Sequence, residues 1–321
     1  MSVNASLPVG SSGLLLGGHD VGALGASALE LLAPLAPLNP QPHFKHAWET
    51  MTDRYTEYQI ATYGSLLVQV LFYFGTALPA FLFQFAAFMK RYKVQVNKQH
   101  SLAEQWVCLR QVLVSKTVIY LPLIISLFYA VHLLGVPMPY DYASMPTWYA
   151  MIPKMLFCLV CEDAWHYFLH RALHHKSVYG RIHKIHHTYN VPFGMAAEYA
   201  HPIETIVLGI GFFFPLPFVC DHLYVFWCWL AVRMIQTTDV HSGFDVPWIN
   251  PLYLIPGYGG VRFHDFHHSY FNANYASTFV WWDWMFGTDK PYRSAEAKRK
   301  AAIAAAKANP KNAKFVASKE E

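Results

Sequence analysis

Long runs of apolar residues with few charges organise the middle of the chain. The first run extends from Tyr63 to Phe88 and the second covers residues 117–136. Each reaches the roughly 20 residues that a helix needs to cross the hydrocarbon core of a bilayer. Backbone groups in lipid must be hydrogen-bonded within their own segment, so such runs predict helices. We therefore expect two membrane helices in residues 51–148, the first of them kinked at Pro79.

Two further apolar runs follow, and both are less regular. Residues 147–165 form a third run, weakened by one lysine and two acidic residues. Residues 202–232 form a fourth, with Pro215 and Pro217 midway, which favours a helical hairpin or a broken re-entrant pair because proline interrupts helices. The pattern predicts an all-α integral membrane protein with about four transmembrane or re-entrant segments.

The two ends of the chain differ from this apolar middle. The first Lys or Arg is Lys45, so the positive segment that opens a secretory signal peptide is missing. We predict a low-complexity, disordered leader over residues 1–50. Residues 291–321 are rich in Ala and Lys, which predicts a solvated basic helical tail. Between them lie the first membrane helices, at 51–148, and a histidine-rich unit at 149–290.

Basic residues predict the orientation of the chain in the membrane. The connection between the first two runs carries six Lys and Arg residues, whereas residues 137–146 carry none. Cytoplasmic loops collect such positive charges. We therefore expect residues 137–146 to lie on the far side of the membrane and the histidine clusters to face the cytosol.

Composition agrees with a membrane protein and excludes other classes. Of the 321 residues, 54% are apolar and only 14% are charged, against roughly 25% charged in ordinary globular chains. A formal net charge of +4 is weak over this length, so we expect no nucleic-acid partner. The five cysteines are an odd number scattered through apolar stretches, which predicts reduced thiols that pack in the core.

Eighteen histidines are the feature that points to chemistry, because imidazole is the commonest metal ligand in proteins. His166, His170 and His174 recur every four residues and share one helical face. Two later clusters have the spacing i, i+3, i+4: they are His183, His186 and His187, and then His264, His267 and His268. The repeated spacing predicts a metal site, and even eight of these nine histidines, with His166 left out, exceed the needs of one ion. Two ions side by side are expected, and spacing alone allows Fe, Zn, Cu or Ni.

Acidic residues near these clusters are of the type that orients a ligating imidazole by accepting its second N–H. The acids are Glu162, Asp163, Glu198, Glu204, Asp239 and Asp265. We single out Glu198, Asp239 and Asp265 as candidate metal ligands or as partners of the ligands. The alternative is that these acids pair only with nearby arginines.

The histidine clusters resemble the three boxes of the membrane fatty acid hydroxylase and sterol desaturase superfamily. Those boxes, His-x-x-x-His, His-x-x-His-His and a later His-x-x-His-His, match His170/His174, His183/His186/His187 and His264/His267/His268. Over residues 150–290 the chain resembles the sterol C-4 methyl oxidase branch, in the strings EDAWHYFLHR, PFGMAAEYAHPIET, TTDVHSGFDVP and NYASTFVWWDWMFGTD. The resemblance implies that residues 149–290 are a catalytic domain of this type. It also implies a ninth ligand, His241, with His166 and His201 as further candidates.

The resemblance further implies a reaction and its cofactors. Two non-haem iron ions would use O2 to oxidise the 4α-methyl group of a sterol to alcohol, aldehyde and carboxylate. The chemistry is reasonable because an unactivated methyl group has no acidic proton for a base to remove. Electrons would come from NAD(P)H through a cytochrome b5-type carrier and its reductase, since GYGGV at 257–261 does not complete a dinucleotide-binding motif. The resemblance also implies the endoplasmic reticulum membrane.

The sequence leaves the substrate-binding residues unidentified. Three aromatic runs, at 72–75, 211–215 and 279–284, are candidates to line a path for an apolar substrate, although such runs commonly only pack. The basic tail is a candidate contact for membrane lipids.

Three alternative functions remain open. A sibling enzyme, a sterol C-5 desaturase or a fatty acid or lipid hydroxylase, would use the same oxidant on another carbon. A zinc or nickel transporter would place its histidines inside the membrane spans, whereas these clusters follow the apolar runs. A haem protein needs only paired axial histidines and would leave the other clustered histidines unexplained.

Overall fold

The computed structural model describes residues 33–136 and 138–308, and this part of the chain is helical, with no strand beyond two isolated bridges. The longer α-helices are α2 (Gln41–Arg54), α4 (Ser65–Phe83), α5 (Leu102–Ser115), α6 (Leu121–Leu133), α7 (Met151–Leu173), α8 (Pro202–Phe213), α10 (Leu223–Val240), α11 (Gly260–Tyr270) and α13 (Lys290–Ala308). The shorter α-helices are α3 (Glu57–Gln59), α9 (Leu216–Val219) and α12 (Trp281–Phe286). The all-α class predicted from the sequence is confirmed.

Short helical turns of other types join these helices. The 3-10 turns are η1 (Ala33–Leu38), η3 (Ala87–Tyr92), η5 (Trp148–Ala150), η6 (His183–Thr188), η7 (Gly194–Glu198) and η8 (Pro251–Leu254). Two π-helical turns, η2 (Ile60–Gly64) and η4 (Lys116–Tyr120), lie inside longer helical stretches. They link α3 to α4 and α5 to α6, so each pair runs as one long helix.

Three helical stretches of the described chain are long and apolar enough to cross a membrane: Glu57–Phe83, Leu102–Leu133 and Pro202–Val219. The second begins earlier than the apolar run at 117–136 because a capping box starts α5. The Ser101 hydroxyl accepts the Glu104 N–H at 3.3 Å, and the Glu104 carboxylate accepts the Ser101 N–H at 2.8 Å. The chain thus has the helices of a membrane protein.

The predicted count of about four segments is not confirmed. The third apolar run is helical, as part of α7, but its lysine and two acids keep α7 outside the three candidate spans. Its acids are buried inside the protein, with Glu162 only 2% exposed and Asp163 fully enclosed. The fourth run breaks at Pro215, between α8 and α9, as its prolines predict.

Part of the predicted leader is ordered, which corrects its boundary at residue 50. Residues 1–32 lie outside the described part of the chain, but residues 41–50 belong to α2. The buried Trp48 ring donates from Nε1 to the Tyr140 carbonyl at 2.8 Å, and Gln41 Nε2 donates to the Pro146 carbonyl at 2.6 Å. These contacts fix α2 against the connection between α6 and α7. The predicted tail helix is present as α13, while residues 309–321 lie outside the description.

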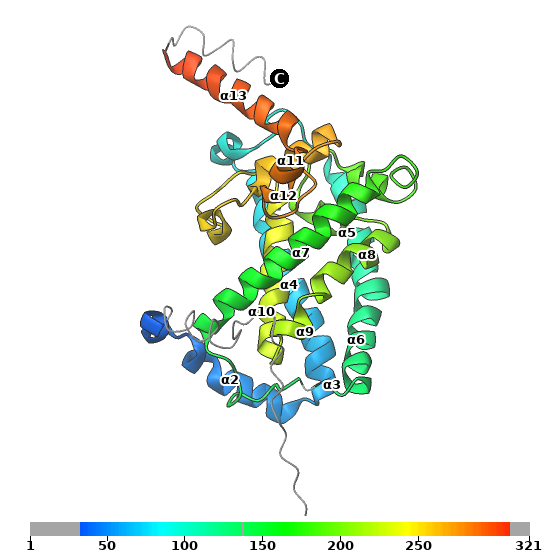
Figure 1. Cartoon of the computed structure of the whole chain (residues 1–321), viewed down its shortest axis with the longest axis vertical. Coiled ribbons are helices and arrows are strands. Elements are labelled where there is room, and N and C mark those ends of the chain that lie inside the picture. The colour runs from blue at the N-terminus through cyan, green and yellow to red at the C-terminus, as the bar shows by residue number, and fades with distance from the viewer. Residues whose placement is uncertain (1–32, 137, 309–321) are drawn as a thin grey trace, which may run out of the picture.

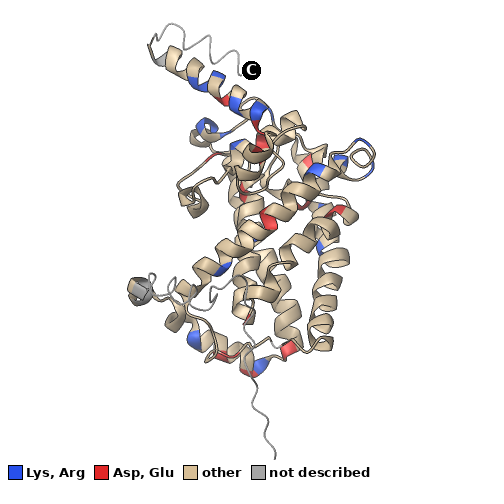
Figure 2. Cartoon of the chain, in the orientation of Figure 1, with Lys and Arg blue, Asp and Glu red and all other residues tan. Residues whose placement is uncertain are grey.

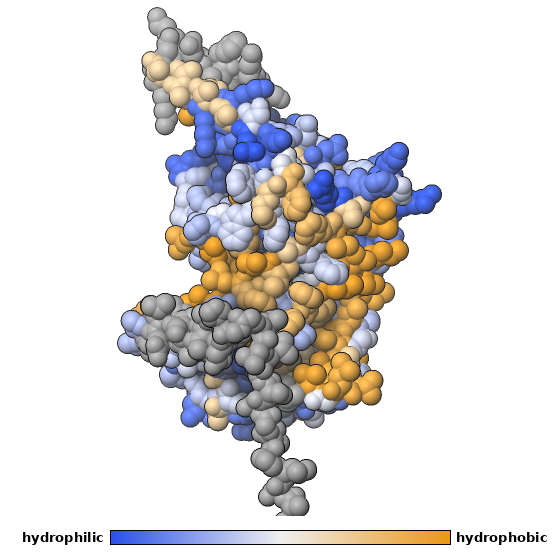
Figure 3. All heavy atoms as spheres, viewed as in Figure 1, coloured by the Kyte–Doolittle hydropathy of each residue, from blue (hydrophilic) through white to orange (hydrophobic). Residues whose placement is uncertain are grey.

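The helices form an elongated body whose two ends differ in character (Figure 1). α10 packs along α4 and α7 packs along α8. α2 lies across one end, while α11 and α12 lie at the other, from which α13 projects. Charged residues lie mainly towards the two ends (Figure 2), and an apolar surface covers the flank formed by α6 and α8 (Figure 3). This distribution is typical of a membrane protein whose middle part lies in lipid.

The basic connection between the first two spans lies at the same end as the histidines. The Val94 N–H donates to the Gly243 carbonyl at 3.0 Å, and Gln95 donates to the Asp265 carboxylate at 3.1 Å. The connection after α6, which has no Lys or Arg, lies at the opposite end, where its Tyr140 and Pro146 carbonyls bond to α2. The predicted co-location of basic residues and histidine clusters therefore holds in the fold.

Candidate metal centre

Four elements carry the clustered histidines to one place. The first box is at the end of α7, where His170 and His174 are one turn apart. The second box forms the 3-10 turn η6, and the third lies on α11. His241 is the residue that ends α10. The helical spacing predicted for the second box is therefore realised in a tighter turn than an α-helix.

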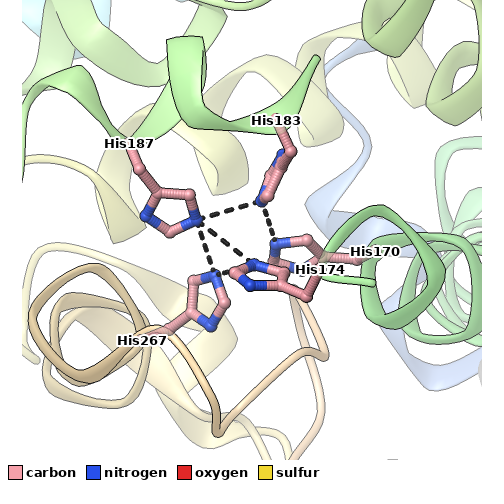
Figure 4. Close-up of side chains that lie close together, drawn as sticks. All are labelled: His170, His174, His183, His187 and His267. Carbon is pink, nitrogen blue, oxygen red and sulfur yellow. Dashed lines mark hydrogen bonds between the residues drawn. The ribbon is translucent and has the colours of Figure 1, made fainter. Parts of the chain in front are cut away.

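Five of these histidines form one group, and their ligand nitrogens all lie within 4.8 Å of one another. The members are His170, His174, His183, His187 and His267 (Figure 4). The Nε2 atoms of His170 and His183 are 3.0 Å apart, and those of His187 and His267 are 3.2 Å apart. The close-up shows the rings pointing their nitrogens at a common centre.

The other four histidines form a second group with the same character. Its members are His186, His241, His264 and His268, all buried. Nε2 of His264 is 2.9 Å from Nε2 of His241 and 3.1 Å from Nε2 of His268. The nine histidines singled out in the sequence thus divide into two adjacent groups of five and four.

The outer nitrogens show where the imidazole protons are. Nδ1 of His170, His241 and His267 lies 2.6–2.7 Å from a backbone carbonyl, which can only accept. Nδ1 of His186 also meets a carbonyl, and Nδ1 of His183 meets the Glu204 carboxylate at 2.9 Å. Each of these five Nδ1 atoms must donate. A neutral imidazole has only one proton, so the five Nε2 atoms present lone pairs.

Lone pairs that face each other at about 3 Å repel unless a cation lies between them. Nitrogens about 2 Å from a shared transition-metal ion are separated by distances of this size. Imidazole groups oriented from behind by carbonyl or carboxylate acceptors are the usual surroundings of a metal ligand. The arrangement therefore fits two adjacent ions.

Burial keeps these imidazoles neutral. Burial lowers the pKa of His174 to about 3 and that of His186 to about 4, and in His174 the neighbouring His186 adds to the effect. Burial, reinforced by the other imidazoles, holds the pKa of His170 and His267 well below the usual range. Neutral imidazole is the form that binds metals, so the lone pairs stay available well below neutral pH.

The fatty acid hydroxylase family matches residues 155–288, a range that contains all nine histidines. The chain is 50% identical over 274 residues to Methylsterol monooxygenase 1 of Rattus norvegicus, which covers 85% of this chain and 92% of that protein. The chain belongs to the fatty acid hydroxylase family. The resemblance predicted from the histidine boxes is confirmed, and membership indicates an oxidoreductase.

Other relatives of the chain carry two kinds of name. Methylsterol monooxygenase 1 of Danio rerio is 48% identical over 276 residues, covering 86% of this chain and 94% of the relative. Very-long-chain aldehyde decarbonylase GL1-11 of Oryza sativa subsp. japonica is 37% identical over 254 residues, covering 78% and 94%. No solved structure matches the chain.

The other two candidate histidines, His201 and His166, have different partners. His201 caps α8, where its Nδ1 accepts the Ile203 N–H at 3.1 Å. His166 lies one turn before His170 and faces Glu162, with 3.7 Å between Nδ1 and Oε1. Within the described residues, neither histidine belongs to the two groups.

The three acids singled out from the sequence also bond elsewhere. Glu198 pairs with Lys116, Asp239 accepts from Asn250 at 2.7 Å, and Asp265 accepts from Gln95. The acid that does orient a histidine is Glu204, one of the six considered but not among the three. Glu204 is in the first turn of α8, shortly after the His201 cap.

Replacing Glu204 by glutamine is expected to weaken metal binding by about 10–100-fold, because a neutral amide is a poorer acceptor for the His183 proton. Metal content measured against a series of chelator concentrations would show the change. The matched control is Glu57→Gln, at a carboxylate 38% exposed and far from the groups. Equal metal affinity of the Glu204 variant and the wild type would contradict this role.

The lowered histidine pKa values also predict a pH dependence for metal-free protein. In the unfolded chain the imidazoles take up protons below their ordinary pKa of 6.5, whereas folded His174 and His186 do so only near 3 and 4. The unfolded state then binds more protons, so stability falls as pH drops below 6.5. Denaturant midpoints of chelated protein at about pH 7.5 and about pH 5 would test this. Equal midpoints would contradict it.

A cavity adjoins both histidine groups. Its walls come from α4, α6, α7, α8 and α10, and five of the nine histidines border it: His170, His183, His186, His241 and His264. The remaining wall is largely apolar, with Leu123, Leu208, Phe212, Phe213, Phe226 and Leu230. Of the three aromatic runs considered from the sequence, only the one at 211–215 contributes to this lining within the described chain.

Proposed function

We propose that this protein is a methylsterol monooxygenase, which oxidises the 4α-methyl group of a sterol to alcohol, aldehyde and carboxylate with O2. The observation that supports it best is the apolar cavity that ends on two groups of histidines. A sterol is large, rigid and apolar, and transfer of its surface from water into such a cavity is favourable. The similarity to proteins named methylsterol monooxygenase, over most of both chains, supports the choice of substrate.

Two iron ions are the cofactors in this proposal. His170, His174, His183, His187 and His267 would hold one, and His186, His241, His264 and His268 the other. Bound iron would supply the O2 activation that oxidation of an unactivated C–H bond requires. The protein orients the ligands through Glu204 and the backbone carbonyls behind His170, His241 and His267. Its apolar cavity walls keep bulk water away from the methyl group.

Electrons would come from NAD(P)H through a cytochrome b5-type carrier and its reductase. The end of the molecule that carries the histidines also carries exposed basic side chains: Lys98, Arg181 and Lys184. Such charges speed encounter with an acidic carrier. In this proposal that end faces the cytosol and the membrane is that of the endoplasmic reticulum.

Two alternative functions, a sibling enzyme and a metal transporter, are less well supported. A sterol C-5 desaturase or a lipid hydroxylase would use the same site on another carbon, and the rice relative shows that this family carries more than one named activity. A metal transporter is disfavoured because the histidines lie on η6, α11 and the ends of α7 and α10. These elements are outside the three candidate spans.

Sterol analysis by mass spectrometry of cells depleted of the protein would test the proposal. Build-up of 4,4-dimethyl or 4α-methyl sterols, reversed by wild type and not by His267→Ala, is expected. An unchanged 4-methyl pool with a different lipid accumulating would move the protein to a sibling activity. No lipid change would reject the enzyme and favour the transporter.

A further inference from the structure

One polar part of the cavity wall is formed by α7 and α10, beside the proposed metal ligands. Arg233 Nη2 donates to Glu162 Oε1 at 2.9 Å, and the same oxygen faces His166 Nδ1 at 3.7 Å. All three residues border the cavity. Glu162 and Arg233 are buried, and the His166 side chain is 15% exposed. A buried ion pair with a histidine is costly in an apolar wall, which indicates a function.

Two atoms of this cluster, Glu162 Oε2 and His166 Nε2, can accept a further hydrogen bond. Glu162 Oε2 is buried and has no partner among the described residues. The proton of a neutral His166 belongs on Nδ1, because that atom faces the carboxylate. Nε2, at the far side of the ring, then has a lone pair that can accept a hydrogen bond from a ligand in the cavity.

The position of His166 relative to the proposed iron ligands indicates which group of the substrate it can reach. His166 is one helical turn from His170, and the two ring centroids are 5.0 Å apart. In a sterol the 3-hydroxyl and the 4-methyl group are on adjacent ring carbons. When the 4-methyl group is at the histidine groups, the hydroxyl must therefore be within a short distance of them. In the cavity wall, His166 lies one helical turn before the proposed iron ligand His170, on the same face of α7.

We propose that His166 binds the 3-hydroxyl of the sterol through Nε2, while Glu162, itself paired with Arg233, faces Nδ1 of the ring. This role rests on the proposed function and deepens it: His166 is the residue that recognises the hydroxyl and thereby places the neighbouring methyl group. A site built to bind a hydroxyl rejects an analogue without one, because the polar protein atom is left unpaired.

A second polar cluster in the wall is less suited to this task. Glu198 accepts from Gln69 at 3.4 Å through one oxygen and pairs with Lys116 through the other. Both Glu198 oxygens therefore already have partners. The atom of this cluster that remains open, Gln69 Oε1, is on α4, whereas His166 is on the helix that carries His170.

The proposal is tested by measuring the equilibrium binding of sterols to the full chain in lipid nanodiscs, which requires no turnover. The probes are a 4,4-dimethyl sterol with its 3β-hydroxyl and the matched 3-deoxy compound. Wild type should bind the hydroxyl compound about tenfold more tightly, the effect of one buried hydrogen bond. His166→Phe should remove the preference, His166→Gln should retain most of it, and His43→Gln in α2 should have no effect. Iron content should be unchanged in all three variants.

The outcomes separate this inference from the proposed function. A wild-type protein without preference, or a His166→Phe variant that keeps it, would overturn the role of His166. Loss of iron from His166→Phe would also overturn it and make His166 a ligand. If that variant does not assemble, His166→Leu replaces it in the same comparison. Binding with the expected preference but no oxidation of the 4-methyl group would reject the proposed reaction instead.

Discussion

Replacing His183 or His267 by alanine is expected to lower turnover by more than about a hundredfold and to reduce the bound metal. Both side chains are buried in the five-histidine group, and their outer nitrogens are fixed by Glu204 and by the Ala273 carbonyl. Alanine removes the lone pair and leaves these acceptors without a donor. Metal analysis of purified protein and product formation per mole of enzyme would show both effects.

The histidine variants should still insert in the membrane, because η6 and α11 are outside the candidate spans. His43→Ala is the control, since His43 is an exposed residue of α2 at the other end of the molecule. A histidine variant that fails to insert, or one that inserts and keeps full activity and metal, would contradict the assignment.

Asp163→Ala is expected to destabilise the protein by about 3 kcal/mol and to disturb the metal centre. The fully buried Asp163 carboxylate accepts backbone N–H groups of Ser277, Thr278 and Phe279 at 2.7–2.9 Å. These bonds tie the segment after α11 to α7. The same segment supplies the Tyr275 carbonyl that orients His170. Alanine leaves three buried donors unpaired, and each unpaired donor costs free energy.

Denaturant unfolding in detergent, with metal content measured in parallel, would check this prediction. The control is Asp221→Ala, at an exposed carboxylate paired with Lys154, because surface ion pairs contribute about 0–1 kcal/mol. Similar unfolding free energies for both variants would show that the carboxylate of Asp163 does not hold the segment.

The sequence was sufficient to identify the nine clustered histidines but not their division into groups. Spacing within a helix or turn determines which histidines share a face, so each box could be recognised locally. Each group, however, mixes boxes: His187 belongs with His267, while its neighbour His186 belongs with His241. That pairing depends on how α7, η6, α10 and α11 pack, which no local pattern specifies.

The partners of the acids and the membrane segments also could not be predicted from local sequence. Glu204 and Glu198 are similar in sequence context, yet one meets an imidazole and the other meets Lys116. The run at 147–165 has the apolar character of a span. Its acids instead serve the protein interior, Asp163 by holding the segment after α11 and Glu162 by pairing with Arg233. Hydropathy alone does not show that α7 turns these acids to the interior while Leu156, Phe157 and Val160 of the same helix are exposed.

The most direct test of the central claim uses purified protein in lipid nanodiscs, loaded with iron and supplied with a 4,4-dimethyl sterol, 18O2 and reducing equivalents. We predict a 4-hydroxymethyl sterol carrying one 18O atom, followed by more oxidised 4-carboxy product, and no product from His267→Ala. Recovery of unchanged sterol from iron-loaded wild type, or of a ring-desaturated sterol without 18O, would contradict the account.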